Sequence, residues 1–171
     1  MSSPHVAGIF ALLKQAHPEW SPAAAKSALM TTSYQQVRDN DRVSKADPFD
    51  MGAGHVNPGG KWSKKGSIND PGLVYDAGFF DYLGFLCDVY PAVFANPNAT
   101  CSFLESIGVP TKAYNLNYPS IGAASVPGSL TIQRTVTSVA SKKTTFKAQV
   151  KAPDGYNVTV TPNILTLEPG D

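Results

Sequence analysis

The chain has 171 residues, of which 42% are hydrophobic and 16% charged, with 14 glycines and 14 prolines. This composition, with a net charge of +1, excludes disorder over the whole length and gives no reason to expect nucleic acid or a membrane as a partner. No apolar run approaches the ~20 residues that span a bilayer. The first residues lack the pattern of a signal peptide, so we expect any export signal to lie outside this chain.

The first helix is predicted from Ser3 to Ala16. Pro4 fits a first helical turn, and the proline after His17 ends the helix. Four apolar residues recur at the spacing of one buried face: Val6, Ile9, Phe10 and Leu13. The small residues Ala7 and Gly8 predict that this helix packs closely against a neighbour.

Ser21 and Pro22 are favourable N-cap and first-turn residues for a second helix. Residues 34–72 are rich in polar, glycine and proline residues and are predicted to be loop. A short helix is expected at residues 79–86, and residues 91–112 are expected to be irregular. Four residues of the short helix share one face: Phe79, Tyr82, Leu83 and Leu86.

The last third of the chain has the alternating pattern of strands. Three runs alternate apolar and polar residues, and a fourth is extended: Ser129–Thr137, Thr145–Lys151, Tyr156–Thr161 and Ile164–Leu167. Short strands at this spacing favour an antiparallel β-sandwich. Such domains take ~100 residues, so we expect the chain to stop within this one.

Cys87 and Cys101 lie too far apart for a zinc pattern, in which cysteines are usually about two to four residues apart. They are either free thiols or a disulfide. Asn98 and Asn157 each begin an Asn-x-Thr acceptor sequence for N-glycosylation, which favours an oxidising compartment and therefore the disulfide. A bridge closing this loop could add roughly 3 kcal/mol of stability.

The sequence Met-Ser-Ser-Pro-His-Val-Ala-Gly at residues 1–8 resembles the second part of the nucleophile motif of subtilisin-like serine proteases, the subtilases. In that family the motif reads Gly-Thr-Ser-Met, two small residues, then Pro-His-Val-Ala-Gly, and the serine before the methionine is catalytic. The resemblance implies that the nucleophile precedes Met1 and that this chain holds no catalytic residue. It gives six residues a structural role in the helix: Met1, Ser2, Ser3, Pro4, His5 and Gly8.

Further segments resemble subtilases, and in particular the plant-type enzymes and their bacterial relatives, in family order: Trp20–Ala23 with Lys26–Ser33, Gly52–Pro58, Asp70–Asp76, Tyr82–Cys87 and Asn115–Ile121. The resemblance implies an α+β fold. Residues 1–76 would be the terminal helices of a subtilisin-like α/β catalytic domain. Residues 77–114 would be a connector with a short helix and the disulfide. Residues 115–171 would begin a fibronectin type III-like antiparallel β-sandwich.

Other residues that could carry chemistry receive structural interpretations. Ser2 and Ser3 are first-turn residues, and His5 lies on the same helix, too near to act as their general base. We expect His17 to be exposed and His55 to be a structural loop residue. We expect four carboxylates of the polar loop to be solvated: Asp39, Asp41, Asp47 and Asp50. They match no calcium loop, so neither metal nor cofactor is expected. Three tyrosines are interpreted as domain-packing aromatics: Tyr114, Tyr118 and Tyr156.

The resemblance implies a secreted serine endopeptidase that hydrolyses protein or peptide substrates with an Asp-His-Ser triad. All three triad residues would precede Met1, so the chain alone is predicted to be inactive and to need the N-terminal part of the catalytic domain. Two alternatives stay open, a non-catalytic structural or binding module and a catalytically dead homologue. Against the module, helices beginning near Ser3 and Ser21 would leave an apolar face in water, which predicts poor solubility.

Overall fold

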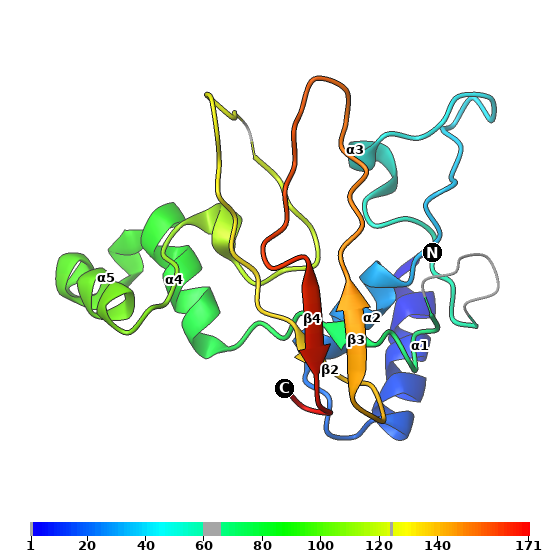
Figure 1. Cartoon of the computed structure of the whole chain (residues 1–171), viewed down its shortest axis with the longest axis horizontal. Coiled ribbons are helices and arrows are strands. Elements are labelled where there is room, and N and C mark those ends of the chain that lie inside the picture. Colours follow the sequence, from blue (N-terminus) through cyan, green and yellow to red (C-terminus); the bar gives the residue numbers. More distant parts are fainter. Residues whose placement is uncertain (1, 60–65, 124) are drawn as a thin grey trace.

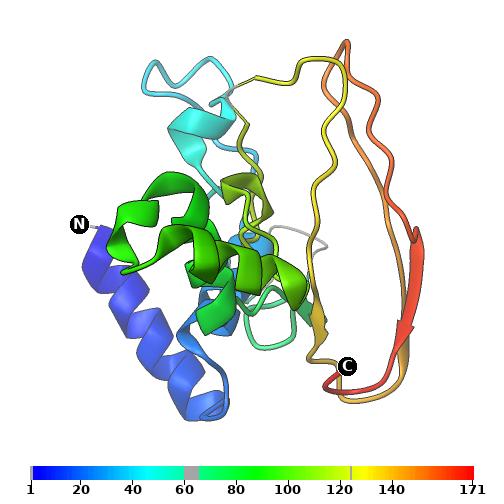
Figure 2. The ribbon, with the colours of Figure 1, turned by 90° about the vertical axis from the view of Figure 1, so that its left-hand side faces the viewer.

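The computed structural model describes residues 2–59, 66–123 and 125–171. Helices and small antiparallel sheets make up the fold, as predicted, and in Figure 2 the helices and the extended last third form two layers. The elements in chain order are α1 (Ser2–Ala16), α2 (Pro22–Thr31), α3 (Pro48–Met51), β1 (Leu73–Val74), α4 (Phe79–Val89), η1 (Pro91–Val93), α5 (Pro97–Ser106), η2 (Ala113–Asn115), β2 (Thr137–Ser138), β3 (Thr144–Lys147) and β4 (Ile164–Leu167), as labelled in Figure 1.

Helix α1 follows its predicted bounds, but only part of its apolar face is covered. Leu13 is 1% exposed and packs in a cluster with Ala25, Leu29 and Ile68. Val6, Ile9 and Phe10 are half-buried against that cluster. The expected close packing at Ala7 and Gly8 is wrong for the described chain. Both residues are exposed, and a Cβ at Gly8 would meet nothing within 4 Å.

Helix α2 begins as its sequence predicts and becomes the centre of the helical layer. The Ser21 hydroxyl accepts a hydrogen bond from the Ala24 N–H at 3.0 Å, which caps the helix. Its small residues Ala24 and Ala28 are buried against Val74 of β1. Alanine leaves room for a strand to approach closely, so the alanine-rich composition explains how β1 lies against this helix.

Two short antiparallel ladders connect distant parts of the chain. In the first, Leu73 and Val74 of β1 pair with Ser138 and Thr137 of β2. In the second, β3 and β4 pair over four residues each. Because β1 precedes α4 and β2 belongs to the last third, the first ladder joins the two layers.

The strand predictions in the last third were only partly correct. Of Ser129–Thr137, only Thr137 lies in a strand, and the described Tyr156–Thr161 segment forms none. Every residue from 150 to 164 is exposed. Alternation makes a run suitable for a sheet, but a ladder also needs a neighbouring backbone to receive its hydrogen bonds. In this structure β3 pairs with β4, and the run between them stays outside the ladder.

Helix α4 forms as predicted and extends to Val89, and the face that Phe79, Tyr82, Leu83 and Leu86 share is only partly covered. Phe79 and Tyr82 are 72% and 45% exposed, whereas Gly84 is buried. A Cβ at Gly84 would lie 2.3 Å from the Pro110 carbonyl oxygen, so only glycine permits this close approach.

The prediction that residues 91–112 are irregular is also wrong, because the segment contains η1 and α5. The side chain of Asn96 accepts a hydrogen bond from the Ala99 N–H at 3.2 Å, and Pro97 occupies the first turn of α5. The predicted loop at 34–72 likewise contains α3, capped by Asp47 with Pro48 after it. Both helices have start signals that the sequence already carried.

Candidate functional site

The start of α1 is the part of the chain that resembles the nucleophile motif. Ser2, Ser3, Pro4 and His5 are all exposed on its first turn, and Met1 lies outside the described residues. The first N–H groups of a helix have no partner within the helix, and its dipole favours negative charge nearby. This end of α1 can therefore stabilise an anion that forms next to it.

The other two histidines occupy structural positions. The His17 ring stacks on Trp20 with centroids 4.0 Å apart, and its Nε2 lies 3.1 Å from the Asn69 carbonyl oxygen. Its side chain is only 25% exposed, so the expectation of an exposed His17 was wrong. His55 is exposed, and its backbone pairs with Tyr34 through two N–H to carbonyl bonds of 2.8 Å.

The glycine before His55 is required by that pairing. Gly54 has φ of +113°, and a Cβ there would lie 2.4 Å from the Tyr34 carbonyl oxygen. A larger residue would push the two backbones apart. The Gly-Ala-Gly-His segment therefore folds the loop onto the end of α2.

The carboxylates of the polar loop are occupied in turns and caps. Asp41 accepts hydrogen bonds from the Ser44 hydroxyl and from the backbone N–H groups of Val43 and Ser44, and these bonds lower the pKa of Asp41. Asp47 accepts the N–H groups of Phe49 and Asp50 at the start of α3. Across residues 2–59, 66–123 and 125–171, no three His, Cys, Asp or Glu side chains are grouped to hold a metal ion.

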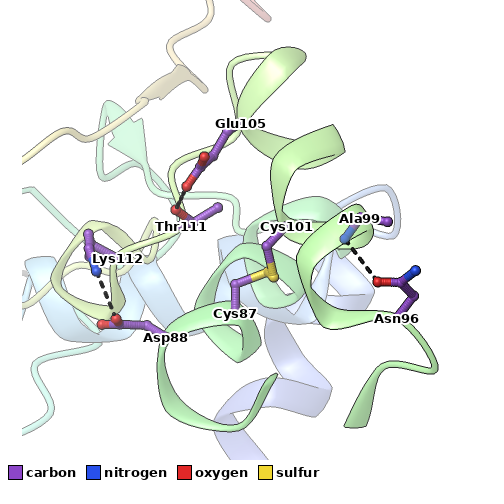
Figure 3. The surroundings of a disulfide bond; sticks show 8 residues. All are labelled: Cys87, Asp88, Asn96, Ala99, Cys101, Glu105, Thr111 and Lys112. Carbon is purple, nitrogen blue, oxygen red and sulfur yellow. Dashed lines mark hydrogen bonds and ion pairs between the residues drawn. A yellow bond between two sulfur atoms is a disulfide. The ribbon is translucent and has the colours of Figure 1, made fainter. Parts of the chain in front are cut away.

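A disulfide joins Cys87 of α4 to Cys101 of α5, with their Cα atoms 5.8 Å apart (Figure 3). The sequence favoured this bridge over free thiols. Beside it, Asp88 accepts a hydrogen bond from the Ala113 N–H at 2.9 Å and pairs with Lys112 Nζ at 3.2 Å. The Ala113 hydrogen bond contributes most to lowering the pKa of Asp88. The bridge and this carboxylate together fasten α4 to the elements that follow it.

A set of polar contacts that the sequence did not predict holds residues 114–120 against the last third. Arg134 donates to the carbonyl oxygens of Tyr114, Tyr118 and Ser120 at 2.8, 2.9 and 3.0 Å. Burial lowers the pKa of its guanidinium. The sequence hinted at this role only indirectly, because Arg134 interrupts the alternation of apolar and polar residues in its run.

Two asparagines complete this set of contacts, which we call the Arg134 clasp. The side chains of Asn115 and Asn117 accept the N–H groups of Gln133 and Thr135 at 2.9 and 3.0 Å. Asn115 ends η2 and Asn117 lies two residues further on, and the N–H groups that they accept, those of Gln133 and Thr135, are also two residues apart. In the clasp, side-chain amides therefore join the two segments in place of backbone carbonyl groups.

The three tyrosines differ in burial. Tyr114 and Tyr118 are half-buried, and Lys26 Nζ of α2 lies 4.7 Å from the centre of the Tyr118 ring. Tyr156 is 59% exposed, so its interpretation as a packing aromatic was wrong for the described structure. It lies in the run that has no ladder, which explains the exposure.

Comparisons with protein families and with individual proteins relate the chain to known sequences. Residues 1–54 match the subtilase family, and residues 115–171 match a fibronectin type-III domain. The chain is 42% identical over 188 residues to Subtilisin-like protease SBT2.5 of Arabidopsis thaliana, covering 99% of this chain and 22% of that protein. It is 42% identical over 168 residues to Subtilisin-like serine-protease S of Lotus japonicus, covering 95% of this chain and 21% of that protein.

A third relative, Subtilisin-like protease SBT3 of Solanum lycopersicum, is 40% identical over 187 residues, covering 98% of this chain and 23% of that protein. The chain thus spans roughly a fifth of the length of each of these relatives. Among the described residues, no helix is both long and apolar enough to cross a bilayer. The chain belongs to the subtilase family of serine proteases and joins a stretch of that family to a fibronectin type III-like stretch.

Proposed function

We propose that this chain is part of a secreted subtilisin-like serine endopeptidase and supplies the helix behind the catalytic serine, not the serine itself. One observation carries the proposal: α1 begins at Ser2, directly after the position of the motif methionine, and residues 1–54 match the subtilase family. In that motif the nucleophile comes immediately before the methionine. The nucleophile of the whole enzyme would therefore precede Met1.

The start of α1 suits the chemistry of peptide-bond hydrolysis. A serine nucleophile attacks the scissile carbonyl while a histidine takes its proton, and negative charge develops on the carbonyl oxygen. Preorganised N–H donors stabilise that charge. Serine at the amino end of α1 would lie where the unpaired N–H groups and the helix dipole act. Proteins and peptides are the proposed substrates of the whole enzyme.

The chain by itself is proposed to be inactive because none of its three histidines is suited to act as the base. His5 lies on the first turn of α1 with Ser2 and Ser3, where the helix fixes their separation. His17 is held by Trp20 and Asn69, and His55 lies in the exposed loop. In subtilisin, removing the serine or histidine alone lowers turnover by about a million-fold.

We further propose that the peptidase portion ends near residue 76, that residues 77–114 form a connector, and that the remainder belongs to the fibronectin type III-like portion. The exposed small face of α1 at Ala7 and Gly8, with Leu12 64% exposed, supports a requirement for the earlier part of a catalytic domain as its cover. The disulfide and the two acceptor sequences support an extracellular location.

A fluorophosphonate probe, which labels activated serines covalently, tests the proposal on the purified chain. We expect no labelling, and an intact subtilase serves as the positive control. Labelling that disappears in a Ser2→Ala/Ser3→Ala variant would contradict the proposal. The gene supplies a second test, because the codons directly before Met1 should encode Gly-Thr-Ser. A different triplet in a reliable sequence would overturn the position assigned to the nucleophile.

A further inference from the structure

The two acceptor sequences for N-glycosylation differ in backbone conformation, because the first is helical and the second is extended. Asn98 and Thr100 belong to the first turns of α5, where the Thr100 N–H bonds to the Asn96 carbonyl oxygen at 3.0 Å. Asn157 and Thr159 belong to the exposed run that enters neither helix nor ladder, drawn as an extended segment in Figures 1 and 2. Both asparagines are exposed, so exposure alone does not distinguish them.

The chemistry of modification does distinguish them. The motif requires a hydroxyl two residues after the asparagine, so the modifying enzyme must reach both side chains at once. In an extended chain, residues two apart point to the same side. In a helix with 3.6 residues per turn they point to nearly opposite sides and do not face each other. Asn157 and Thr159 therefore present the required pair, whereas Asn98 and Thr100 do not.

The Cys87–Cys101 disulfide holds the first sequence in its helix. An isolated helix shorter than ~12 residues is marginal in water, and α5 has 10. Cys101 directly follows Thr100 and is tied to α4, and Leu104 further along α5 is 1% exposed. Figure 3 shows the bridge near the Asn96–Ala99 cap at the start of the same helix. With the bridge open, residues 98–100 would be held in the helix only by the Asn96 cap and by the burial of Leu104, and they would become extended more often.

We propose that Asn157 is the N-glycosylation site of the folded chain and that closing the Cys87–Cys101 bridge withdraws Asn98 from modification. The inference rests on the proposed secretion, which would bring the chain to the modifying enzyme. In the reaction, the asparagine Nδ2 forms a bond to C1 of a lipid-linked oligosaccharide. The bond from C1 to the diphosphate oxygen breaks, the lipid diphosphate leaves, and the amide proton passes to a base of the enzyme.

The test uses the unmodified, oxidised chain with purified oligosaccharyltransferase and a lipid-linked oligosaccharide, with occupancy measured by peptide mass spectrometry. We expect modification at Asn157, and a rate at Asn98 lower by about tenfold or more, because modification of a held segment follows the population of its opened form. Equal rates at Asn98 and Asn157, or no modification at Asn157, would overturn the proposal.

A second arm opens the bridge. In an Asn157→Gln background, Cys87→Ser should raise the rate at Asn98 by about tenfold or more. An unchanged rate would overturn the role of the disulfide, and circular dichroism shows whether the rest of the variant is still folded. The oxidised wild-type comparison stands even where the variant unfolds. Purified components also separate this inference from the proposed secretion. Even if the chain were never exported in cells, it would still be modified preferentially at Asn157 in vitro.

Discussion

The helical layer and the extended last third both contain regularly spaced apolar residues, at helical spacing in the first and in alternation in the second, but bury them very differently. In the helical layer, Leu13, Ala28 and Val74 are at most 1% exposed, because α1, α2 and β1 lie against one another. In the last third, Val158 and Val160 are 47% and 45% exposed on a cleanly alternating run. The spacing of apolar residues thus makes a segment suitable for burial, but the segment is buried only where another element packs against it.

The two layers are held together by a small set of polar contacts. Within the helical layer, Ser27 of α2 is fully buried and accepts the Tyr75 N–H at 2.9 Å, which holds β1 in place for its pairing with β2 of the last third. The Val139 N–H continues the β1–β2 pairing by donating to the Gly72 carbonyl at 3.0 Å. The Arg134 clasp adds contacts between residues 114–120 and the last third. The last third therefore depends on the helical layer, and the following changes test that dependence.

Leu13→Ala should give the largest effect. It removes a buried side chain from the α1–α2 cluster and should lower the free energy of unfolding by about 3 kcal/mol. Urea unfolding followed by circular dichroism measures it. The matched control is Leu12→Ala on the same helix, where the side chain is 64% exposed and the loss should be small. Equal losses for both leucines would contradict the burial described here.

Opening the disulfide with Cys87→Ser should cost roughly 2–4 kcal/mol, because the bridge restricts the unfolded chain. The loss should be concentrated in α4 and α5, so hydrogen exchange of the Leu104 amide is the informative readout. Amides of α2, such as that of Leu29, serve as the internal control. Equal loss of protection in α2 and α5 would show that α4 and α5 unfold together with α2 as one unit.

Arg134→Ala should destabilise the contact between the layers by about 2 kcal/mol, since it leaves three carbonyl oxygens without their charged donor. Arg134→Lys should recover only part of this, because an ammonium lacks the planar fork of the guanidinium. Faster hydrogen exchange at Gln133 and Thr135 would report the opened clasp. Full recovery by lysine would mean that charge alone suffices there.

Ser27→Ala should cost about 1 kcal/mol, because the N–H of Tyr75 loses its acceptor in a buried place. Exchange of the Tyr75 amide measures the local effect. Ser2→Ala, on the exposed first turn of α1, is the control and should leave that amide unchanged. An unaffected Tyr75 amide in the Ser27 variant would show that another group holds β1 to α2.

The smallest expected effect is a pH dependence from Asp88. The Ala113 N–H holds the folded-state pKa of this carboxyl below its ordinary value of 3.8. Its contribution to stability is therefore complete above that value and is lost as the pH falls through the lower folded-state pKa. Thermal unfolding from pH 5 to pH 2 should be less pH-dependent in Asp88→Asn. An identical profile for the variant would contradict this role.

The sequence by itself determined the features whose signals lie within a few residues. Ser21 and Pro22 begin α2 as predicted, α1 follows its apolar spacing, and the cysteine pair forms the favoured bridge. The motif order indicated the subtilase family before any geometry was known. The caps at Asp47 and Asn96 were equally local, so α3 and α5 could have been predicted from their start signals.

Tertiary structure alone decided which of these segments are covered and what joins them. The Ser27–Tyr75 contact links residues 48 positions apart, and the Asn117–Thr135 contact links residues 18 apart. No local pattern specifies such partners, because burial and hydrogen bonding depend on which distant backbone arrives. For the same reason Leu13 is buried while Gly8, on the same helix, faces open space.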